Sequence, residues 1–472
     1  MSLLGAGARV VDAAGGGELS GAALPERVAG LAEALAPLPP GVLFARTAVD
    51  VPSVLRYLAA FEAGRAVALL DEGQDRDVLL ELVARFRPAA VLGADADAAA
   101  PDGYRADALA ADGGPVWVRE DPEGVVPHPD LAVLLPTSGS TGNPKFVRLS
   151  RHAVLANAEA IARVLGIDAT EVAPTSLPLH YSYGMSVLNS HLVRGATVVV
   201  EPTGVMSRAF WQAVEEHKIT SLAGVPYHYE MLKRLRFDPA RYPSLRTITQ
   251  AGGRLRDDLV VDFNDRMTAV GGRMFVMYGQ TEAAPRMATV PAERLAEKIG
   301  SAGPALPGGE FRVRRDDGVE TTEPDVVGEV VYRGPNVMMG YAESEAELAL
   351  GDVVGGVLET GDLGRLDAEG YLYLTGRLKR IGKVFGNRVN LDDLERMVVD
   401  AGLGVGAVAA VPAGDKVVLW LEGADAERRK AVARALSERL HLHVTGFDVR
   451  ETDDLPLLPS GKVDYRALEG RA

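Results

Sequence analysis

The sequence contains no cysteine. This absence excludes disulfides, zinc–thiolate centres and a cysteine nucleophile, so any thiol in the chemistry has to come from a partner molecule. No run of 18 apolar residues occurs, and the segment from Met1 to Arg9 lacks the basic stretch and apolar core of a secretion signal. We therefore expect a protein that has no membrane contact and resides in the cytoplasm.

Positive charge is also scarce. The chain has 50 lysines and arginines against 65 aspartates and glutamates, which gives a formal net charge of −15. This balance disfavours non-specific binding to nucleic acids or anionic membranes, so neither is an expected partner. A site for a polyanion such as a nucleoside triphosphate would have to be a local basic island. At 472 residues the chain is too long for one core, and we expect two or more domains.

Apolar runs alternate with helical periods along the first part of the chain. Helices are expected over residues 25–38, 51–63 and 77–86, with strands over 66–70 and 89–92. This alternation predicts an α/β fold, a large N-terminal domain with doubly wound mixed sheets. Alternating strand patterns at 311–332 and 363–374 predict a β-rich subdomain. A segment dense in Gly, Lys and Arg at 376–390 marks the expected boundary between domains 1–378 and 379–472, the second being small, mobile and α+β. A helix is expected over residues 426–440 of that domain, and Ser150 is the expected N-cap of a helix that runs through Leu165.

A polar loop follows an expected buried strand at Leu131–Leu135. The loop offers three hydroxyls, two glycines and a terminal lysine: Ser138, Ser140, Thr141, Gly139, Gly142 and Lys145. Glycines allow close backbone approach to an anion, so these donors suit a chain of phosphates. It is not a Walker loop, because Pro144 precedes the lysine and Phe146 follows it. An ordinary surface turn is the alternative interpretation.

A second polar segment, Tyr278-Gly-Gln-Thr-Glu282, follows an expected strand. It therefore lies at the carboxyl edge of a sheet, where open α/β sheets bind ligands. Tyr278 could stack on a purine, Thr281 could bind a phosphate and Glu282 could hold a hard metal ion through oxygen. A strand-end turn with an exposed acid is the alternative.

Two further elements carry charge after tight turns. Asp362 in Thr360-Gly-Asp362 is a good acceptor for the vicinal hydroxyls of a ribose, and an expected hairpin brings Arg377 back beside it. A structural ion pair explains the same residues. Lys462 follows Pro459-Ser-Gly461, a turn that would place it at the end of a short arm; a solvated lysine is the alternative.

These elements, with Gly252-Gly253 after a strand and Gly386-Asn-Arg388, occur in the order and spacing of the adenylate-forming superfamily, which the chain resembles from about Leu134 to Tyr465. That superfamily contains acyl-CoA synthetases, adenylation domains and luciferases. The resemblance implies ATP and Mg²⁺ as cofactors, a small carboxylic acid as substrate, and acyl-AMP formation with release of pyrophosphate. The acyl group then passes to a thiol, either of CoA or of phosphopantetheine on a separate carrier protein.

The resemblance also implies roles for individual residues. Those that contact the phosphates are Thr137, Ser138, Gly139, Ser140, Thr141, Gly142, Lys145 and Thr281. Those around the base and ribose are Gly252, Gly253, Tyr278, Gly279, Gln280, Asp362 and Arg377, and Glu282 binds Mg²⁺. Lys462 bridges the carboxylate and the nucleotide. Lys379 stands at the hinge, where the family more often has aspartate, and Lys383 matches the lysine of the thiol-transfer side.

The segment from Pro178 to Gly184 matches the family's acyl pocket, with Tyr181 beside the substrate carboxylate. Ser182 stands where amino-acid-activating domains carry aspartate, which disfavours an α-amino acid. The walls of this pocket are expected to include Gly252, Tyr183, Gly184, Tyr227 and His228. Such walls favour a small or aromatic acid as substrate, although core packing explains several of these residues equally well. Arg286 could meet a second anionic group on the substrate, but a surface role is the expectation. His180 and His191 are taken as structural.

Two alternatives to an acid–thiol ligase stay open. The variant region around Lys379 and Lys383 would also fit transfer of the activated group to a non-thiol nucleophile, such as an amine or a nitrite-like anion. A non-catalytic nucleotide-binding relative is disfavoured by the presence of Glu282, Asp362 and Lys462 together.

Overall fold

The structure is a computed structural model that describes residues 2–111, 113–137, 145–378, 380–385, 387–458 and 462–472, apart from the side chains of Thr137, Ile381 and Arg388. The chain forms two compact units. One contains residues 1–310 and 332–358, and the other contains residues 311–331 and 359–472. The hinge expected at residue 379 stays a prediction.

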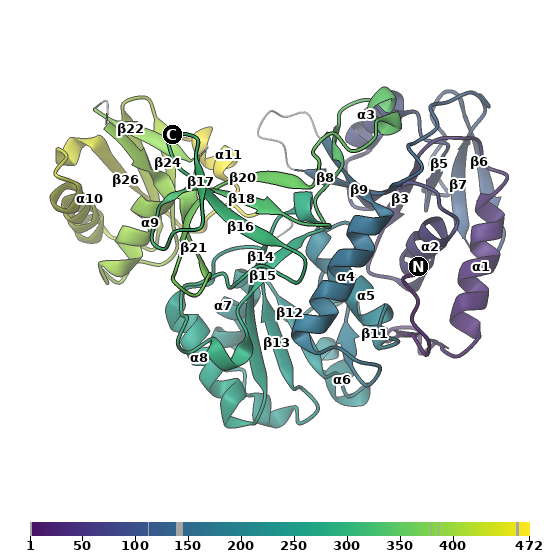
Figure 1. The fold of residues 1–472 in the computed structure, drawn as a ribbon, viewed down its shortest axis with the longest axis horizontal. Coiled ribbons are helices and arrows are strands. Elements are labelled where there is room, and N and C mark those ends of the chain that lie inside the picture. Colours follow the sequence, from purple (N-terminus) through teal and green to yellow (C-terminus); the bar gives the residue numbers. More distant parts are fainter. Residues whose placement is uncertain (1, 112, 138–144, 379, 386, 459–461) are drawn as a thin grey trace. The chain divides into compact units, whose positions relative to one another are not determined.

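A large mixed sheet opens the first unit (Figure 1). Its strands, in order, are β19 (Gly340–Ala342), β9 (Lys145–Ser150), β8 (Leu131–Thr137), β4 (Val67–Asp71), β3 (Leu43–Thr47), β5 (Ala90–Leu92), β7 (Gly114–Arg119) and β6 (Tyr104–Leu109). The central strands β8, β4, β3 and β5 run parallel and are almost entirely buried, as expected when helices cover both faces of a sheet. The helices in this part of the chain are α1 (Ala23–Leu35), α2 (Val51–Glu62) and α3 (Arg76–Phe86).

A second sheet of the same unit carries most of the candidate site. It contains β12 (Ser221–Gly224), β13 (Thr247–Gln250) and β14 (Arg273–Gly279), which run parallel, and the antiparallel β15 (Arg286–Thr289). The accompanying helices are α4 (Arg151–Leu165), α5 (Ser182–Leu192), α6 (Arg208–Glu216), α7 (Pro226–Arg234) and α8 (Asp257–Ala269). A smaller sheet is formed by β10 (Val172–Pro174), β11 (Thr197–Val200), β1 (Arg9–Asp12) and β2 (Glu18–Leu19).

A further sheet has most of its residues in the second unit, and its pairs β16–β17 and β20–β21 are antiparallel. Its order is β17 (Glu320–Thr321), β16 (Glu310–Arg314), β18 (Gly328–Arg333), β20 (Val357–Leu366) and β21 (Leu372–Arg377). The following elements are the hairpin β22 (Ile381–Val384) and β23 (Asn387–Asn390), the sheet β24 (Val408–Ala413), β25 (Lys416–Glu422) and β26 (Phe447–Thr452), and helices α9 (Leu391–Asp400), α10 (Ala426–Leu440) and α11 (Tyr465–Glu469).

In the sheet formed by β24, β25 and β26, alternate residues pack into two different hydrophobic cores. Ala410, Val417 and Leu419 pack with α9 and α10, whereas Ala409 and Val418 face the other way with residues from the C-terminal segment and α11. This is the two-residue period of a strand that is covered on both faces.

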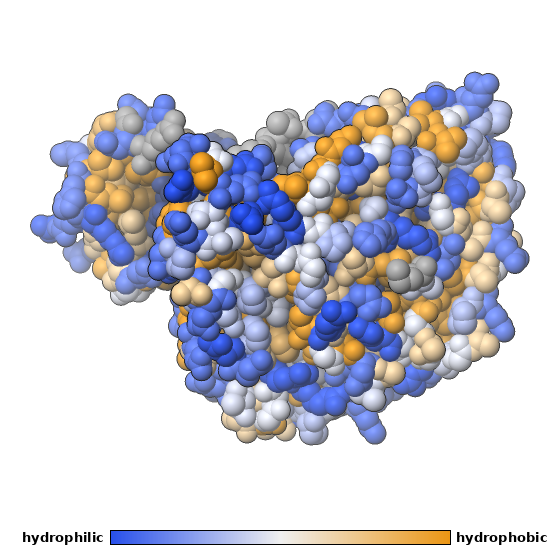
Figure 2. Space-filling model, viewed as in Figure 1, coloured by the Kyte–Doolittle hydropathy of each residue, from blue (hydrophilic) through white to orange (hydrophobic). Residues whose placement is uncertain are grey.

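The predicted fold class is confirmed, and several elements agree closely. Helix α10 has the predicted bounds, and Ser150 caps α4 by accepting a hydrogen bond from the Ala153 N–H at 3.0 Å. Strand β9, which begins at Lys145, was not predicted from the sequence. In the described part of the chain, no helix has the length and apolarity to cross a bilayer. Figure 2 shows hydrophilic and hydrophobic residues intermixed on the visible face, as is usual for a folded protein surface.

Candidate active site

The carboxyl ends of β12, β13 and β14 meet at one edge of the second sheet, because the three strands are parallel and adjacent. Each strand leads directly into a predicted site segment. Tyr227 follows β12, Gly252 and Gly253 follow β13, and Thr281 and Glu282 follow β14 in a short 3-10 turn. This edge is the usual ligand-binding position of an open α/β sheet. Tertiary structure therefore gathers three segments that the sequence could place only one at a time.

Glu282 contacts a tyrosine that sequence reasoning missed. The Tyr341 O–H donates to Glu282 Oε1 at 2.9 Å, and the Lys145 ammonium lies 3.4 Å from the centre of the Tyr341 ring. Tyr341 belongs to β19, which pairs with β9 directly after the phosphate-loop segment. Burial, and next the charge of Glu282, raise the pKa of Tyr341, so its hydroxyl stays protonated and donates to the carboxylate. Tyr341 thus ties the end of the loop to the predicted metal ligand.

The acyl-pocket segment contacts the same turn. Ser182 Oγ lies 3.1 Å from Thr281 Oγ1, although the two residues are 99 positions apart in the chain. Ser182 opens α5, and two residues later a Cβ on Gly184 would lie 2.1 Å from the carbonyl oxygen of Pro178. The helix therefore packs against the preceding segment at a distance that only glycine permits at this position.

Tyr181 and Gly252 lie side by side. A Cβ on Gly252 would stand 2.3 Å from the Tyr181 hydroxyl, and Gly252 has a φ of +83°, which favours glycine. Burial raises the pKa of Tyr181 to about 12, with the charge of Arg286 acting in the opposite direction. The hydroxyl is consequently neutral near pH 7 and can donate a hydrogen bond. Gln250 Nε2 donates to the Gly253 carbonyl at 2.7 Å and fixes the turn.

The other predicted pocket residues differ in exposure. Tyr183 is buried and its hydroxyl lies 2.8 Å from Thr249 Oγ1, so this side chain is held in the core. Tyr227 is 40% exposed. Tyr278, Gly279 and Gln280 are half-buried.

The surface role expected for Arg286 is wrong. The residue is only 3% exposed, and it begins β15, where it pairs with Gly279 of β14. Asn157 Nδ2 donates to the Arg286 carbonyl at 2.7 Å, and the Arg286 N–H donates to Asn157 Oδ1 at 3.2 Å. The sequence carries no signal for this burial, since an arginine soon after a turn is normally solvated.

In the second unit, the predicted hairpin pairs Asp362 with Arg377 across β20 and β21. Arg377 Nε lies 3.0 Å from Asp362 Oδ1, and the carboxylate is almost fully buried whereas the arginine side chain is 59% exposed. The Asp362 N–H donates to Thr360 Oγ1 at 3.1 Å. The proximity that the sequence predicted is confirmed, and the contact with a ribose stays a prediction.

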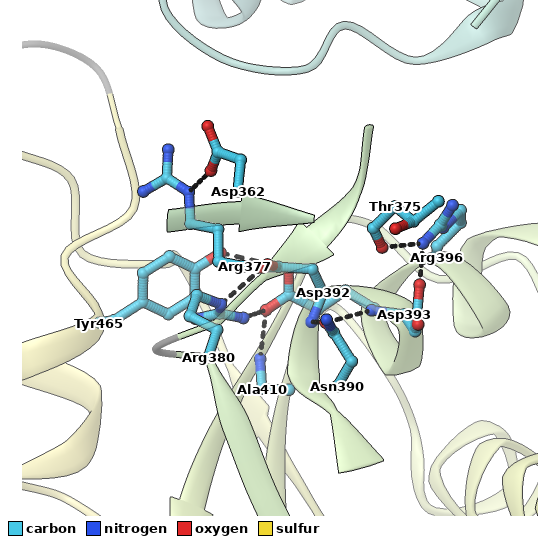
Figure 3. Close-up of polar contacts among 11 residues, drawn as sticks. Asp362, Thr375, Arg377, Arg380, Asn390, Asp392, Asp393, Arg396, Ala410 and Tyr465 are labelled. Atoms are coloured by element: carbon cyan, nitrogen blue, oxygen red, sulfur yellow. Dashed lines mark hydrogen bonds and ion pairs between the residues drawn. The ribbon is translucent and has the colours of Figure 1, made fainter. Parts of the chain in front are cut away.

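Figure 3 shows a buried charge network beside Arg377 that the sequence did not reveal. Arg380 Nη2 donates to Glu395 Oε1 at 2.5 Å and its guanidinium lies 3.7 Å from the centre of the Tyr465 ring. The Tyr465 O–H donates to Glu395 Oε2 at 3.2 Å, and the Ala410 N–H donates to Oε1 at 2.7 Å. Burial raises the pKa of Glu395 to about 7, although Arg380 acts in the opposite direction. This network connects the residue after the expected hinge with the start of α11.

The lysines assigned to catalysis lie in the second unit or outside the described residues. Lys462 is exposed, and its carbonyl accepts a hydrogen bond from the Leu458 N–H at 2.8 Å. Lys383 is exposed on β22. The positions that lie outside the described residues are Lys379, Ser138, Gly139, Ser140, Thr141 and Gly142, together with the side chain of Thr137.

The donors at the site fit Mg²⁺ held jointly with a nucleotide. Within the ranges that the structure describes, no cluster of three or more His, Asp or Glu side chains could form a complete protein metal site. Glu282 instead supplies a single carboxylate, with the Thr281 hydroxyl in the adjacent position. Magnesium is commonly bound by one or two carboxylates plus substrate phosphates, so this donor set suits it.

Comparison with known proteins gives the family. The profile of the AMP-binding enzyme family matches residues 8–342. The chain is 32% identical to the indoleacetate–CoA ligase of Aromatoleum aromaticum over 367 residues, covering 75% of this chain and 70% of the relative. It is 32% identical to a feruloyl-CoA synthase of an Amycolatopsis species over 362 residues, covering 73% and 70%.

A solved structure agrees in fold. The o-succinylbenzoate CoA synthetase of Bacillus subtilis in complex with its acyl-adenylate intermediate superimposes with a TM-score of 0.76 at 24% identity, covering 98% of this chain and 94% of that one. At this identity the match concerns the fold. The chain therefore belongs to the AMP-binding enzymes of the adenylate-forming superfamily and is an AMP-forming carboxylate ligase.

Proposed function

We propose that this enzyme joins a small or aromatic carboxylic acid to CoA in two steps. The acid's carboxylate attacks the α-phosphorus of ATP, which gives acyl-AMP and pyrophosphate. The CoA thiol then attacks the acyl carbon, which gives the thioester and AMP and releases the thiol proton. The observation that carries the proposal is the convergence of Lys145, Tyr341, Glu282, Thr281 and Ser182 at the carboxyl edge of strands β12, β13 and β14.

The first step brings an anion to a polyanion, so catalysis has to come mainly from positioning and charge neutralisation. Lys145 supplies a positive charge at the end of the phosphate loop, and Thr281 supplies a hydroxyl toward the α-phosphate. Mg²⁺, when bound through Glu282, would neutralise further phosphate charge. Tyr341 orients the Glu282 carboxylate by its hydrogen bond. In the second unit, Asp362 and Arg377 are proposed to hold the ribose, and Lys462 to bridge the two reactants.

CoA is the acceptor that the relatives favour, because the indoleacetate and ferulate enzymes are both named as CoA-dependent. Lys383, the matching lysine of the transfer side, would act in that half-reaction after the small domain moves about a hinge at Lys379. A carrier-protein thiol and a non-thiol nucleophile are the competing acceptors. Since ATP and CoA are cytoplasmic metabolites, the proposed reaction belongs in the cytoplasm.

Two measurements on the full chain test the proposal. ATP–pyrophosphate exchange across a panel of short, aryl and functionalised acids should reveal the acids that are activated. AMP release should then depend on CoA and yield an acyl-CoA detectable by mass spectrometry. Phosphopantetheine-loaded carrier protein and hydroxylamine serve as alternative acceptors, and Glu282→Gln serves as the inactive control. Exchange without a CoA-dependent product would refute the acceptor, and no exchange with any acid would refute the activity.

A further inference from the structure

Arg286 is a cation enclosed in the first unit. Its side chain is 3% exposed, and the bonds between its backbone and Asn157 hold it at the start of β15. Burial lowers the pKa of its guanidinium, with Tyr183 and Tyr181 acting in the opposite direction. An arginine nevertheless keeps its charge near neutral pH even when it is buried. The fold therefore holds a positive charge in its interior.

The partners of Arg286 do not neutralise this charge. The guanidinium lies 4.4 Å from the centre of the Tyr183 ring, and Nη2 donates weakly to Ser186 Oγ at 3.3 Å. Its Nε is buried without a hydrogen-bond partner, and among the described residues no carboxylate lies within ion-pair distance. A buried charge without a counter-ion costs several kcal/mol as a general rule, so a structural arginine is normally paired.

A small cavity adjoins the guanidinium. It has a volume of about 30 Å³ and its wall includes Arg286, Tyr183, Ser186, Ser190 and Thr249. That volume accommodates roughly two waters, which is about the size of one carboxylate group. The hydroxyls of Ser186 and Ser190 donate to the carbonyls of Tyr183 and Val187, and Thr249 Oγ1 lies 2.8 Å from the Tyr183 hydroxyl, so these hydroxyls already have partners. The rest of the lining is mainly apolar, so a small oxyanion in this cavity would be held by the guanidinium of Arg286.

Glu171 and His191 also line the cavity, and neither is a counter-ion of Arg286. Glu171 pairs with Arg246 at 3.2 Å and accepts a hydrogen bond from the Thr220 hydroxyl. His191 lies with Nδ1 2.8 Å from the Val187 carbonyl, and burial lowers its pKa. His191 is consequently neutral near pH 7, so Arg286 is the cation on this wall.

The cavity lies one aromatic ring away from the reacting end of the acyl pocket. Tyr181, assigned to the substrate carboxylate, contacts Tyr183 edge-on with ring centres 6.3 Å apart. Tyr183 in turn lies against the guanidinium of Arg286. An acid whose reacting carboxylate sits at Tyr181 would reach Arg286 with a substituent at the far end of a short spacer.

We propose that Arg286 binds a second carboxylate of the substrate, so that the enzyme activates dicarboxylic acids whose two carboxylates are separated by a short chain or one aromatic ring. This inference rests on the proposed function and narrows its substrate class. The second carboxylate of the substrate would form the ion pair that Arg286 lacks in the ligand-free protein. A carboxylate can accept two parallel N–H hydrogen bonds from a guanidinium. Ser186 acts as a positioning residue for the guanidinium.

The first test compares acids of equal shape in ATP–pyrophosphate exchange. Succinate is paired with isohexanoate, and isophthalate with meta-isopropylbenzoate, in which an isopropyl group replaces the second carboxylate. The wild type should prefer the diacid of at least one pair by about 100-fold or more in kcat/KM, because the uncharged analogue leaves the buried cation unpaired. Arg286→Met should abolish this preference, and Arg286→Lys, which keeps a positive charge, should retain part of it.

The second test uses the stability of the ligand-free protein. Arg286→Met removes an unpaired buried charge and is expected to raise the thermal midpoint, whereas a structural arginine would show a lowered midpoint on replacement. Succinate and isophthalate should raise the midpoint of the wild type and not that of the methionine variant.

The outcomes separate the two proposals. No exchange with any acid would refute the proposed function. Efficient exchange with monocarboxylic acids, without preference for the diacid in either pair, would overturn the role of Arg286 and leave the ligase activity standing. Equal losses for both members of each pair in Arg286→Met, with a lowered midpoint, would also overturn it.

Discussion

Replacing Tyr341 by phenylalanine tests how the fold holds the proposed magnesium ligand. The Tyr341 hydroxyl donates to Glu282 at 2.9 Å, while the ring faces the Lys145 ammonium at 3.4 Å. Phenylalanine keeps the ring and removes only the hydrogen bond. The Glu282 carboxylate then loses the donor that orients it.

The size of the effect follows from these two contacts. A hydrogen bond to a charged group contributes about 1.5–3 kcal/mol. Since about 1.4 kcal/mol corresponds to a factor of ten in rate, kcat/KM for magnesium–ATP should fall about 10- to 100-fold in Tyr341→Phe. Tyr341→Leu also removes the ring beneath Lys145, and a cation–π contact contributes about 0.5–2 kcal/mol. The leucine variant should therefore lose a further factor of about 2 to 30.

The assay is ATP–pyrophosphate exchange at saturating acid, with ATP and Mg²⁺ varied independently. Tyr341→Phe should require more Mg²⁺ for half-maximal rate, because Glu282 is less well placed. Tyr57→Phe is the matched control, since it removes a buried hydroxyl that bonds Asn189 Oδ1 at 3.1 Å in the same unit. If both phenylalanine variants retain the wild-type kcat/KM and Mg²⁺ dependence, Tyr341 does not position Glu282 and the reasoning is wrong.

Three further predictions concern both units. Lys462→Ala should abolish acyl-AMP formation and spare thioester formation from preformed acyl-AMP; equal losses in the two half-reactions would contradict the proposed division. Gly184→Ala should destabilise the protein by about 1–3 kcal/mol, because its Cβ would lie 2.1 Å from the Pro178 carbonyl. Gly30→Ala, in helix α1 with its nearest neighbour at 3.8 Å, should stabilise by up to about 1 kcal/mol, and the two are compared by chemical denaturation. Because the folded-state pKa of Glu395 is about 7 against an ordinary 4.5, the folded state retains a proton between these values and stability falls as pH rises through them. Glu395→Gln should flatten that dependence of the thermal midpoint between pH 5 and 7, and an unchanged slope would disprove it.

Local features of the sequence were sufficient for many of the elements, although not for strand β9, and for the position in the chain of the predicted site segments. Helix α10 agrees in both bounds, and the Asp425 side chain caps it by accepting from the Arg428 N–H at 2.8 Å. The Asp362–Arg377 contact was also predictable, because a short turn sets the register of a hairpin. Periodicity, caps and turns each depend on a few neighbouring residues, so they can be recognised in the sequence.

Contacts between distant segments depended on tertiary structure. Tyr341 reaches Glu282 only because β19 pairs with β9, and the burial of Arg286 follows from the pairing of β15 with β14. Arg380, Glu395 and Tyr465 likewise meet across three separate elements. No local pattern encodes which strands become neighbours. The sequence by itself therefore determined the family, the order of the motifs and the chemistry available. Sheet order decided which side chains meet at the candidate site and which buried charge has no counter-ion among the described residues.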